Sequence, residues 1–111
     1  MARELVILTE REATLEEWTS CAADILGAGL VRSYASGVSH LLRPDGEGLV
    51  AFWPARPLEV RREAIGMIGD AADHGSLWID VSLPAGSHDS GMRIATEMAA
   101  RLGGRLVAVT Q

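Results

Sequence analysis

The chain has 111 residues, and its hydrophobic content of 48% and charged content of 23% are those of one soluble globular domain with a single core. The net charge is −5, and because binding to phosphates needs clustered cations, we expect no nucleic-acid partner. The absence of lysine excludes Schiff-base catalysis, and a single cysteine, Cys21, excludes an internal disulfide and a Cys-based metal cage.

The distribution of apolar residues bears on where the protein acts. No uncharged apolar run is long enough to cross a bilayer, and the first residues lack the apolar stretch and the cleavage site of a signal peptide. We therefore expect a soluble, cytoplasmic protein without membrane contacts. Every basic residue is an arginine, and together with the many Ala and Gly residues this favours a GC-rich bacterial genome as the source.

Apolar periodicity and turn-forming residues predict eight elements. They are strands at 4–9, 30–42, 49–53, 77–83 and 105–111 and helices at 14–26, 57–74 and 92–102. Thr14 with Glu17 three residues later is typical of a capping box at the start of the first helix. Gly37 interrupts the second strand and indicates a break or bulge, and turn-forming residues 43–48 join this strand to the next as a hairpin.

The order of these elements is βαββαβ followed by αβ. This order is typical of the ferredoxin-like split-βαβ sandwich, here with an additional C-terminal αβ unit. We therefore expect a single α+β domain over residues 1–111, with a mainly antiparallel five-stranded sheet. Right-handed crossovers place the first two helices on one face of the sheet, so the other face is open unless the last helix covers it.

The strand at 77–83 provides the first candidate site. One set of its alternating side chains is apolar and is expected to face the helices: Leu77, Ile79, Val81 and Leu83. The other set faces away from the helices, together with side chains of neighbouring strands: Trp78, Asp80, Ser82, Trp53, Tyr34 and Arg32. An exposed sheet face with aromatic rings is usually covered by a partner, so we interpret it as an interaction face. The alternatives are a ligand site, or a last helix that lies across the face and makes Trp78 part of the core.

A polar loop is the second candidate site. Ser87, His88, Asp89 and Ser90 directly precede the last predicted helix, where free N–H groups favour anions. The alternative is that Ser87 or Asp89 caps this helix and that His88 is exposed. Adjacent residues do not make a catalytic triad, because triads are assembled from distant segments.

No cofactor or metal is expected from the sequence. His40, His74 and His88 lie in three different elements, without the paired spacing of a metal site. The glycines do not form the fingerprint of a phosphate or dinucleotide loop.

Without a catalytic constellation, the sequence favours a non-enzymatic protein–protein interaction module. Its partner would be a second copy of the chain, as a homodimer, or another protein, as in an immunity or regulatory pair. The alternative is a dimeric α+β barrel that binds or transforms a small apolar molecule in a cavity on the open sheet face. Asp80, His40 and Tyr34 are then the polar groups of that cavity, with Asp80 as its acid or base if it is deeply buried.

Overall fold

A computed structural model describes residues 3–27, 30–57, 77–84 and 89–109 of the chain. The helices and strands within these ranges are β1 (Arg3–Thr9), α1 (Leu15–Leu26), β2 (Leu30–Ser33), β3 (Ser39–Leu42), β4 (Gly48–Phe52), β5 (Arg56–Pro57), β6 (Leu77–Leu83), α3 (Asp89–Arg101) and β7 (Arg105–Ala108).

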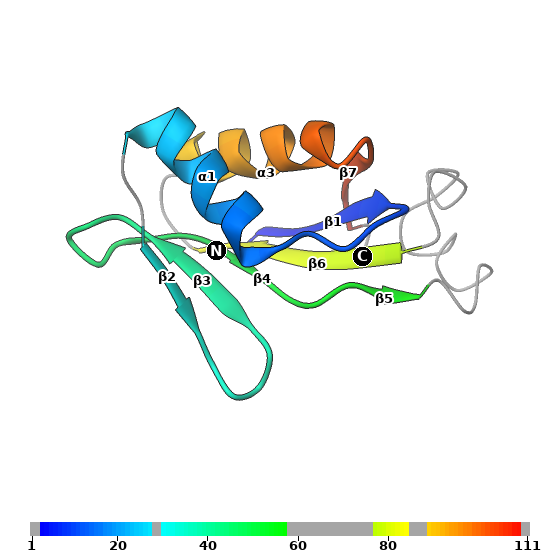
Figure 1. The fold of residues 1–111 in the computed structure, drawn as a ribbon, viewed down its shortest axis with the longest axis horizontal. Coiled ribbons are helices and arrows are strands. Elements are labelled where there is room, and N and C mark those ends of the chain that lie inside the picture. Colours follow the sequence, from blue (N-terminus) through cyan, green and yellow to red (C-terminus); the bar gives the residue numbers. More distant parts are fainter. Residues whose placement is uncertain (1–2, 28–29, 58–76, 85–88, 110–111) are drawn as a thin grey trace.

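The architecture is α+β, as predicted. Two helices lie side by side in one layer, and a large antiparallel sheet forms the second layer (Figure 1). The strand order in the sheet is β2-β3-β4-β6-β1-β7, and the short β5 pairs with β6. Within the described ranges, neither helix is long and apolar enough to cross a membrane.

The start of α1 follows from its capping residues. The Thr14 hydroxyl accepts a hydrogen bond from the Glu17 N–H, and the Glu17 carboxylate accepts one from the Thr14 N–H, so the predicted capping box is confirmed. Arg11 donates two hydrogen bonds of 2.9 and 2.7 Å to the same carboxylate. Chiefly because of Arg11, and then of the Thr14 N–H, the pKa of Glu17 falls from 4.5 to about 2. Gly27, at a φ of 78°, ends the helix.

The segment 30–42, predicted as a strand with a break or a bulge at Gly37, is broken there. This segment forms two strands, β2 and β3, which pair with each other as a hairpin. Its turn closes with a hydrogen bond of 3.0 Å from the Tyr34 N–H to the Val38 carbonyl. Gly37 has a φ of 97°, a conformation that glycine adopts without steric cost, so the break at this residue is a tight turn and not a bulge. Within the described residues, this hairpin and β5 bring the sheet to seven strands, where five were expected.

The predicted helix at 57–74 falls almost entirely outside the described residues. Its first residue, Pro57, belongs instead to β5, where it lies opposite Leu77. The ferredoxin-like order with an additional αβ unit depends on that helix, so it stays a prediction.

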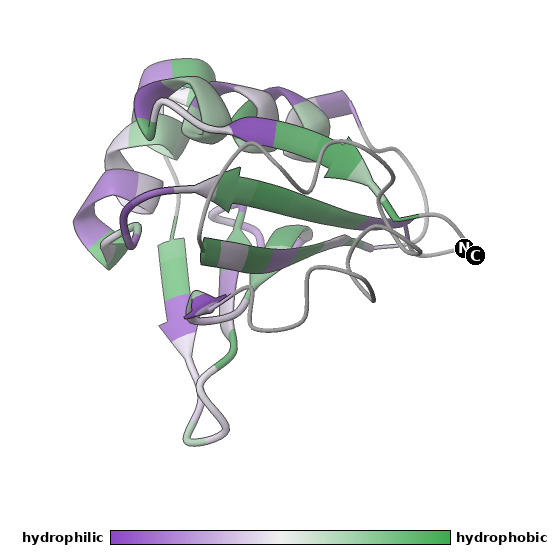
Figure 2. Ribbon diagram, turned by 90° about the vertical axis from the view of Figure 1, so that its right-hand side faces the viewer, coloured by the Kyte–Doolittle hydropathy of each residue, from purple (hydrophilic) through white to green (hydrophobic). Residues whose placement is uncertain are grey.

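The last helix does not cross the outer face of the sheet, which we define as the face opposite α1 and α3. Instead, α3 packs beside α1, and both helices share one core with the sheet (Figure 1). Apolar side chains of the sheet, Ile79, Val81 and Leu83 among them, contact helix residues such as Trp18 and Met98 in this core. Figure 2 shows how the hydrophobic residues follow the central strands while the helices also carry hydrophilic ones.

A second, smaller cluster lies on the outer face. Val6, Leu8 and Trp78 form it and are buried, with Val107 and Val109 packed against them. The alternation of the strand at 77–83 predicted this separation of Trp78 from Ile79. Both faces of the central strands are therefore apolar near β1.

Candidate functional site

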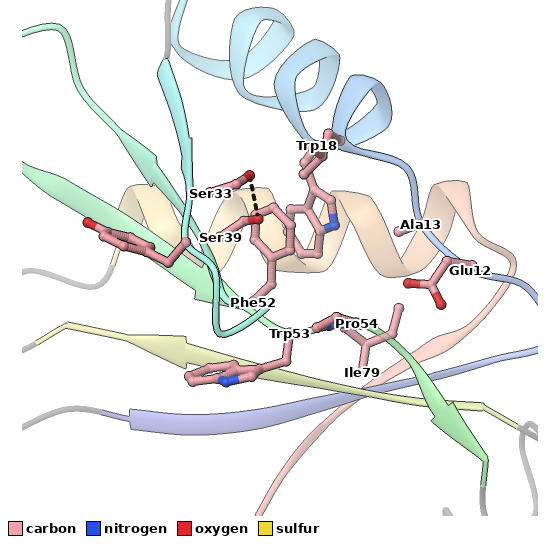
Figure 3. A pocket seen from close by; sticks show the side chains of 12 residues that line it. Glu12, Ala13, Trp18, Ser33, Ser39, Phe52, Trp53, Pro54 and Ile79 are labelled. Carbon is pink, nitrogen blue, oxygen red and sulfur yellow. Dashed lines mark hydrogen bonds between the residues drawn. The ribbon is translucent and has the colours of Figure 1, made fainter.

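A pocket of about 310 Å³ opens where the start of α1, the β2–β3 hairpin and the end of β4 meet (Figure 3). We call it the aromatic pocket, and the described residues that line it are Glu12, Ala13, Leu15, Trp18, Ser33, Tyr34, Gly37, Ser39, Phe52, Trp53, Pro54 and Ile79. The chain has three tryptophans, one tyrosine and one phenylalanine, and all of them except Trp78 belong to this set. Such a concentration of rings around one hollow makes it the leading candidate for a binding site.

The inner wall of the aromatic pocket is a stacked pair of rings. Trp18 projects from α1 and Phe52 from β4, and their ring centroids are 4.1 Å apart with an interplanar angle of 11°. Both side chains are buried in the main core. Since core packing restricts them, this wall is set before any ligand arrives.

The rim of the aromatic pocket is exposed and apolar. Four large hydrophobic side chains are exposed among the described residues, and three of them line this pocket: Leu15 at 48%, Tyr34 at 44% and Trp53 at 37%. The fourth, Leu30, begins β2 and is 54% exposed. Exposed apolar groups usually occur singly, so three around one hollow indicate a contact surface.

The polar groups of the pocket include a carboxylate and two hydroxyls. Glu12 accepts a hydrogen bond from the Ala55 N–H, at 3.0 and 3.2 Å to its two oxygens. The hydroxyls of Ser33 and Ser39 bond to each other at 3.0 Å (Figure 3). Among the described residues that line the pocket, Glu12 alone carries a charge, and it is negative.

The predicted interaction face places Trp78 and Asp80 together, but in a closed arrangement. Trp78 is only 5% exposed, and its indole N–H donates to the Asp80 carboxylate at 2.7 Å. Arg56 forms a salt bridge to Asp80 at 3.1 Å, and its guanidinium lies 4.7 Å from the centroid of the Trp78 ring. The carboxylate of the half-buried Asp80 therefore already has an ion-pair partner and a hydrogen-bond donor inside the chain.

The other residues of that face are spread along the sheet. Arg32 lies opposite His40, and the Tyr34 ring meets the His40 ring edge-on at 5.1 Å. Ser82 donates to the Glu4 carboxylate at 3.1 Å. The Trp53 backbone N–H donates a hydrogen bond of 3.1 Å to the Asp80 carbonyl. Trp53 also borders the aromatic pocket and two further hollows.

Those two hollows separate the predicted polar groups of the ligand cavity, because each contains only one of them. One, of about 280 Å³, includes His40, Trp53 and Ser82, and the other, of about 220 Å³, includes Glu4, Trp53 and Asp80. Tyr34 belongs to the aromatic pocket, so the structure does not gather Asp80, His40 and Tyr34 in a single cavity.

The second candidate site is described only in part. Ser87 and His88 lie outside the described residues, while Asp89 and Ser90 are the first residues of α3. The Ser90 hydroxyl accepts a hydrogen bond of 2.8 Å from Arg43, which belongs to the turn between β3 and β4. The anion-binding role of this loop stays a prediction.

The described residues contain no cluster of three or more His, Cys, Asp or Glu side chains placed to hold a metal ion. His74 lies outside these ranges, as does His88. Cys21 is buried in the core, and burial raises the pKa of its thiol, so it is unsuited to nucleophilic attack.

The sequence does not predict the pocket, although its four aromatic residues all lie in predicted elements. Trp18 lies in the helix predicted at 14–26, and Glu12 precedes that helix without any recognisable signal. The missing information is spatial, because the pocket exists only once the β2–β3 hairpin brings Tyr34 to the residues after β4. The sequence Phe52-Trp53-Pro54 is the one local hint, since a proline interrupts strand pairing and so places these aromatic residues at the end of β4.

Comparisons with known proteins add no family. No family model matches the chain, and the searches of curated proteins and of solved structures found no match.

Proposed function

We propose that the protein is a non-enzymatic protein–protein interaction module, and that the rim of the aromatic pocket is its contact surface. The observation that carries this proposal is the grouping of Leu15, Tyr34 and Trp53 around a hollow with a stacked aromatic wall. Interfaces concentrate their binding energy in a few aromatic anchors at well-packed pockets, surrounded by contacts that exclude water. This rim has that composition.

The partner is a second copy of the chain or a different protein. Small size and a net charge of −5 favour an immunity-type or regulatory role with a heterologous partner. Self-association through the same rim would give a homodimer in which each copy covers the other's pocket.

The first test replaces the rim residues one at a time. Trp53→Ala and Tyr34→Ala remove the anchors, while Leu30→Ala removes an exposed apolar side chain outside the pocket and is the matched control. The protein is isolated from its own host, and native mass spectrometry identifies a homodimer or a complex. The complex is then rebuilt from purified components, and its Kd is measured by calorimetry.

We expect Trp53→Ala to weaken the complex by about 2 kcal/mol or more, roughly 30-fold in Kd, and Leu30→Ala to leave it unchanged. A purified complex that tolerates both Trp53→Ala and Tyr34→Ala refutes the proposed contact surface. Trp78 is a poor choice for this test, because its burial and its bond to Asp80 make Trp78→Ala a folding mutation.

A second candidate function is small-molecule binding on the outer face, as part of a dimeric barrel. The larger of the two hollows beside Trp53 favours it, since it combines apolar walls with His40 and Ser82, while the smaller one adds the carboxylates of Glu4 and Asp80. Extra mass of a few hundred daltons on the native protein, lost in His40→Ala, would support this function over the interaction module.

We also infer that the core belongs to the ferredoxin-like class. With the β2–β3 hairpin and β5 set aside, the chain order β1–α1–β4–β6–α3–β7 is a βαββαβ series. Two features support the inference: β1 lies between β6 and β7, and β6 lies between β1 and β4. In this arrangement α3, and not the predicted helix at 57–74, is the second helix of the series.

A further inference from the structure

We propose that the aromatic pocket receives an arginine side chain of the partner protein, which lies against the exposed rings of the rim, Tyr34 and Trp53, and places its guanidinium beside the Glu12 carboxylate. This proposal rests on the proposed function and names the chemistry of the group that enters the same site.

The negative charge of Glu12 in the pocket disfavours apolar and acidic side chains of a partner protein. Once a partner covers the rim, Glu12 loses its contact with water, and an unpaired carboxylate in a covered site costs several kcal/mol. An apolar side chain of the partner would leave the carboxylate without a counter-charge, so the free-energy cost would remain. An acidic side chain of the partner would add charge repulsion to that cost. A cationic side chain removes it, because Glu12 keeps lone pairs beyond those used by the Ala55 N–H.

The neighbouring arginines of this chain are already engaged. Arg11, next to Glu12 in sequence, is paired with Glu17 at 2.7 Å. Arg56 is paired with Asp80 at 3.1 Å and lies over Trp78. Within the described part of the chain, no ion pair neutralises Glu12, and neither of these two arginines competes for its carboxylate.

The shape of the pocket favours arginine over lysine. A guanidinium is planar, stacks on aromatic rings and bonds a carboxylate with two parallel N–H groups, while an ammonium is a compact and strongly hydrated charge. The same chain shows this geometry at Arg56, which covers Trp78 and bonds Asp80 at once. The aromatic pocket also combines exposed rings, those of Tyr34 and Trp53, with a carboxylate, that of Glu12, and its described lining residues include no arginine.

The test compares two peptides that differ in charge and not in shape. Acetyl-Gly-Arg-Gly-amide carries the guanidinium, and acetyl-Gly-citrulline-Gly-amide carries a neutral group of the same outline. Each is titrated into the ¹⁵N-labelled protein, and the three tryptophan indole N–H signals are followed. Trp18 and Trp53 line the pocket, while Trp78 lies on the outer face and is the internal control.

We expect the arginine peptide to shift the Trp18 and Trp53 signals with a Kd on the order of 1 mM, and the citrulline peptide to bind roughly tenfold more weakly. Glu12→Gln should remove most of this preference, while Glu16→Gln, in the first turn of α1 but outside the pocket lining, should retain it. Equal binding of the two peptides, shifts confined to Trp78, or no shift at all would each overturn the proposal.

The two proposals fail in different ways. If the two peptides bind with equal Kd but Trp53→Ala still weakens the purified complex, the proposed interaction module is supported. The proposal that an arginine enters the pocket is then wrong. If Trp53→Ala leaves the Kd of the purified complex unchanged, the proposed contact surface is wrong, and the peptide results do not alter that conclusion.

Discussion

Gly91, in the first turn of α3, marks the closest approach of this helix to the sheet. A Cβ atom added there would overlap the carbonyl oxygen of Leu49 and would lie 2.9 Å from Cδ2 of Leu83. The carbonyl belongs to the backbone of β4 and cannot rotate away, so Gly91→Ala forces the start of α3 off the sheet. The substitution tests whether glycine at this position sets the spacing between the two layers.

The expected cost is the difference between two opposing effects. Alanine is a better helix former than glycine by about 1 kcal/mol, which would stabilise an unhindered helix. Overpacking a well-filled core costs about 1–3 kcal/mol, and more where backbone atoms collide. Because the collision here is with backbone, we expect Gly91→Ala to lower the free energy of unfolding by about 2 kcal/mol net.

Urea unfolding measures this loss as a lower midpoint with an unchanged slope. Gly48→Ala is the matched control, since its Cβ would meet only Pro84 Cγ, at an ordinary contact distance of 3.8 Å. We expect the control to unfold at or near the wild-type midpoint. If Gly91→Ala is as stable as Gly48→Ala, the close packing of α3 on β4 is refuted.

Two further substitutions test other contacts of the fold. Glu17→Gln keeps the cap but removes the charge that Arg11 stabilises. Because the folded pKa of about 2 lies below 4.5, this stabilisation is full above pH 4.5 and is lost as the pH falls toward 2. The urea midpoints of wild type and variant should therefore differ at neutral pH and converge as the pH approaches about 2. A constant difference across that range would contradict the assigned ion pair. Trp78→Phe removes the 2.7 Å bond to Asp80 and should lower the free energy of unfolding by about 2 kcal/mol in the same assay, whereas an unchanged midpoint would show that the bond contributes nothing.

The local features of this fold were predictable because they depend on neighbours in sequence. The capping box needs only Thr14 and Glu17, and the two faces of β6 follow from strict alternation around Ile79. The end of α1 at Gly27 is of the same kind. Each of these features depends on residues three or four positions apart, and each occurs in the structure at the predicted position.

The pocket and the strand count were not predictable by the same means. Gly37 is compatible with a bulge or with a tight turn, and only the pairing of Arg32 with His40 selects the turn. That choice moves Tyr34 from a sheet face to the rim of the pocket. The burial of Trp78 likewise depends on Val6 and Leu8, which are about 70 residues away in the chain. Contacts of this range leave no periodic signal in the sequence.

The position of β1 between β6 and β7 has a consequence for synthesis. β6 begins about 70 residues after β1 ends, and at roughly 5–20 residues per second the ribosome needs about 4–14 s to deliver it. During that time Val6, Ile7 and Leu8, all fully buried in the finished protein, have neither of their two partner strands. Pairing over such separations is also slow once the partners exist. Among the described strands, β1 therefore waits longest for its partners, and we expect its apolar residues to be the ones that chaperones protect during synthesis.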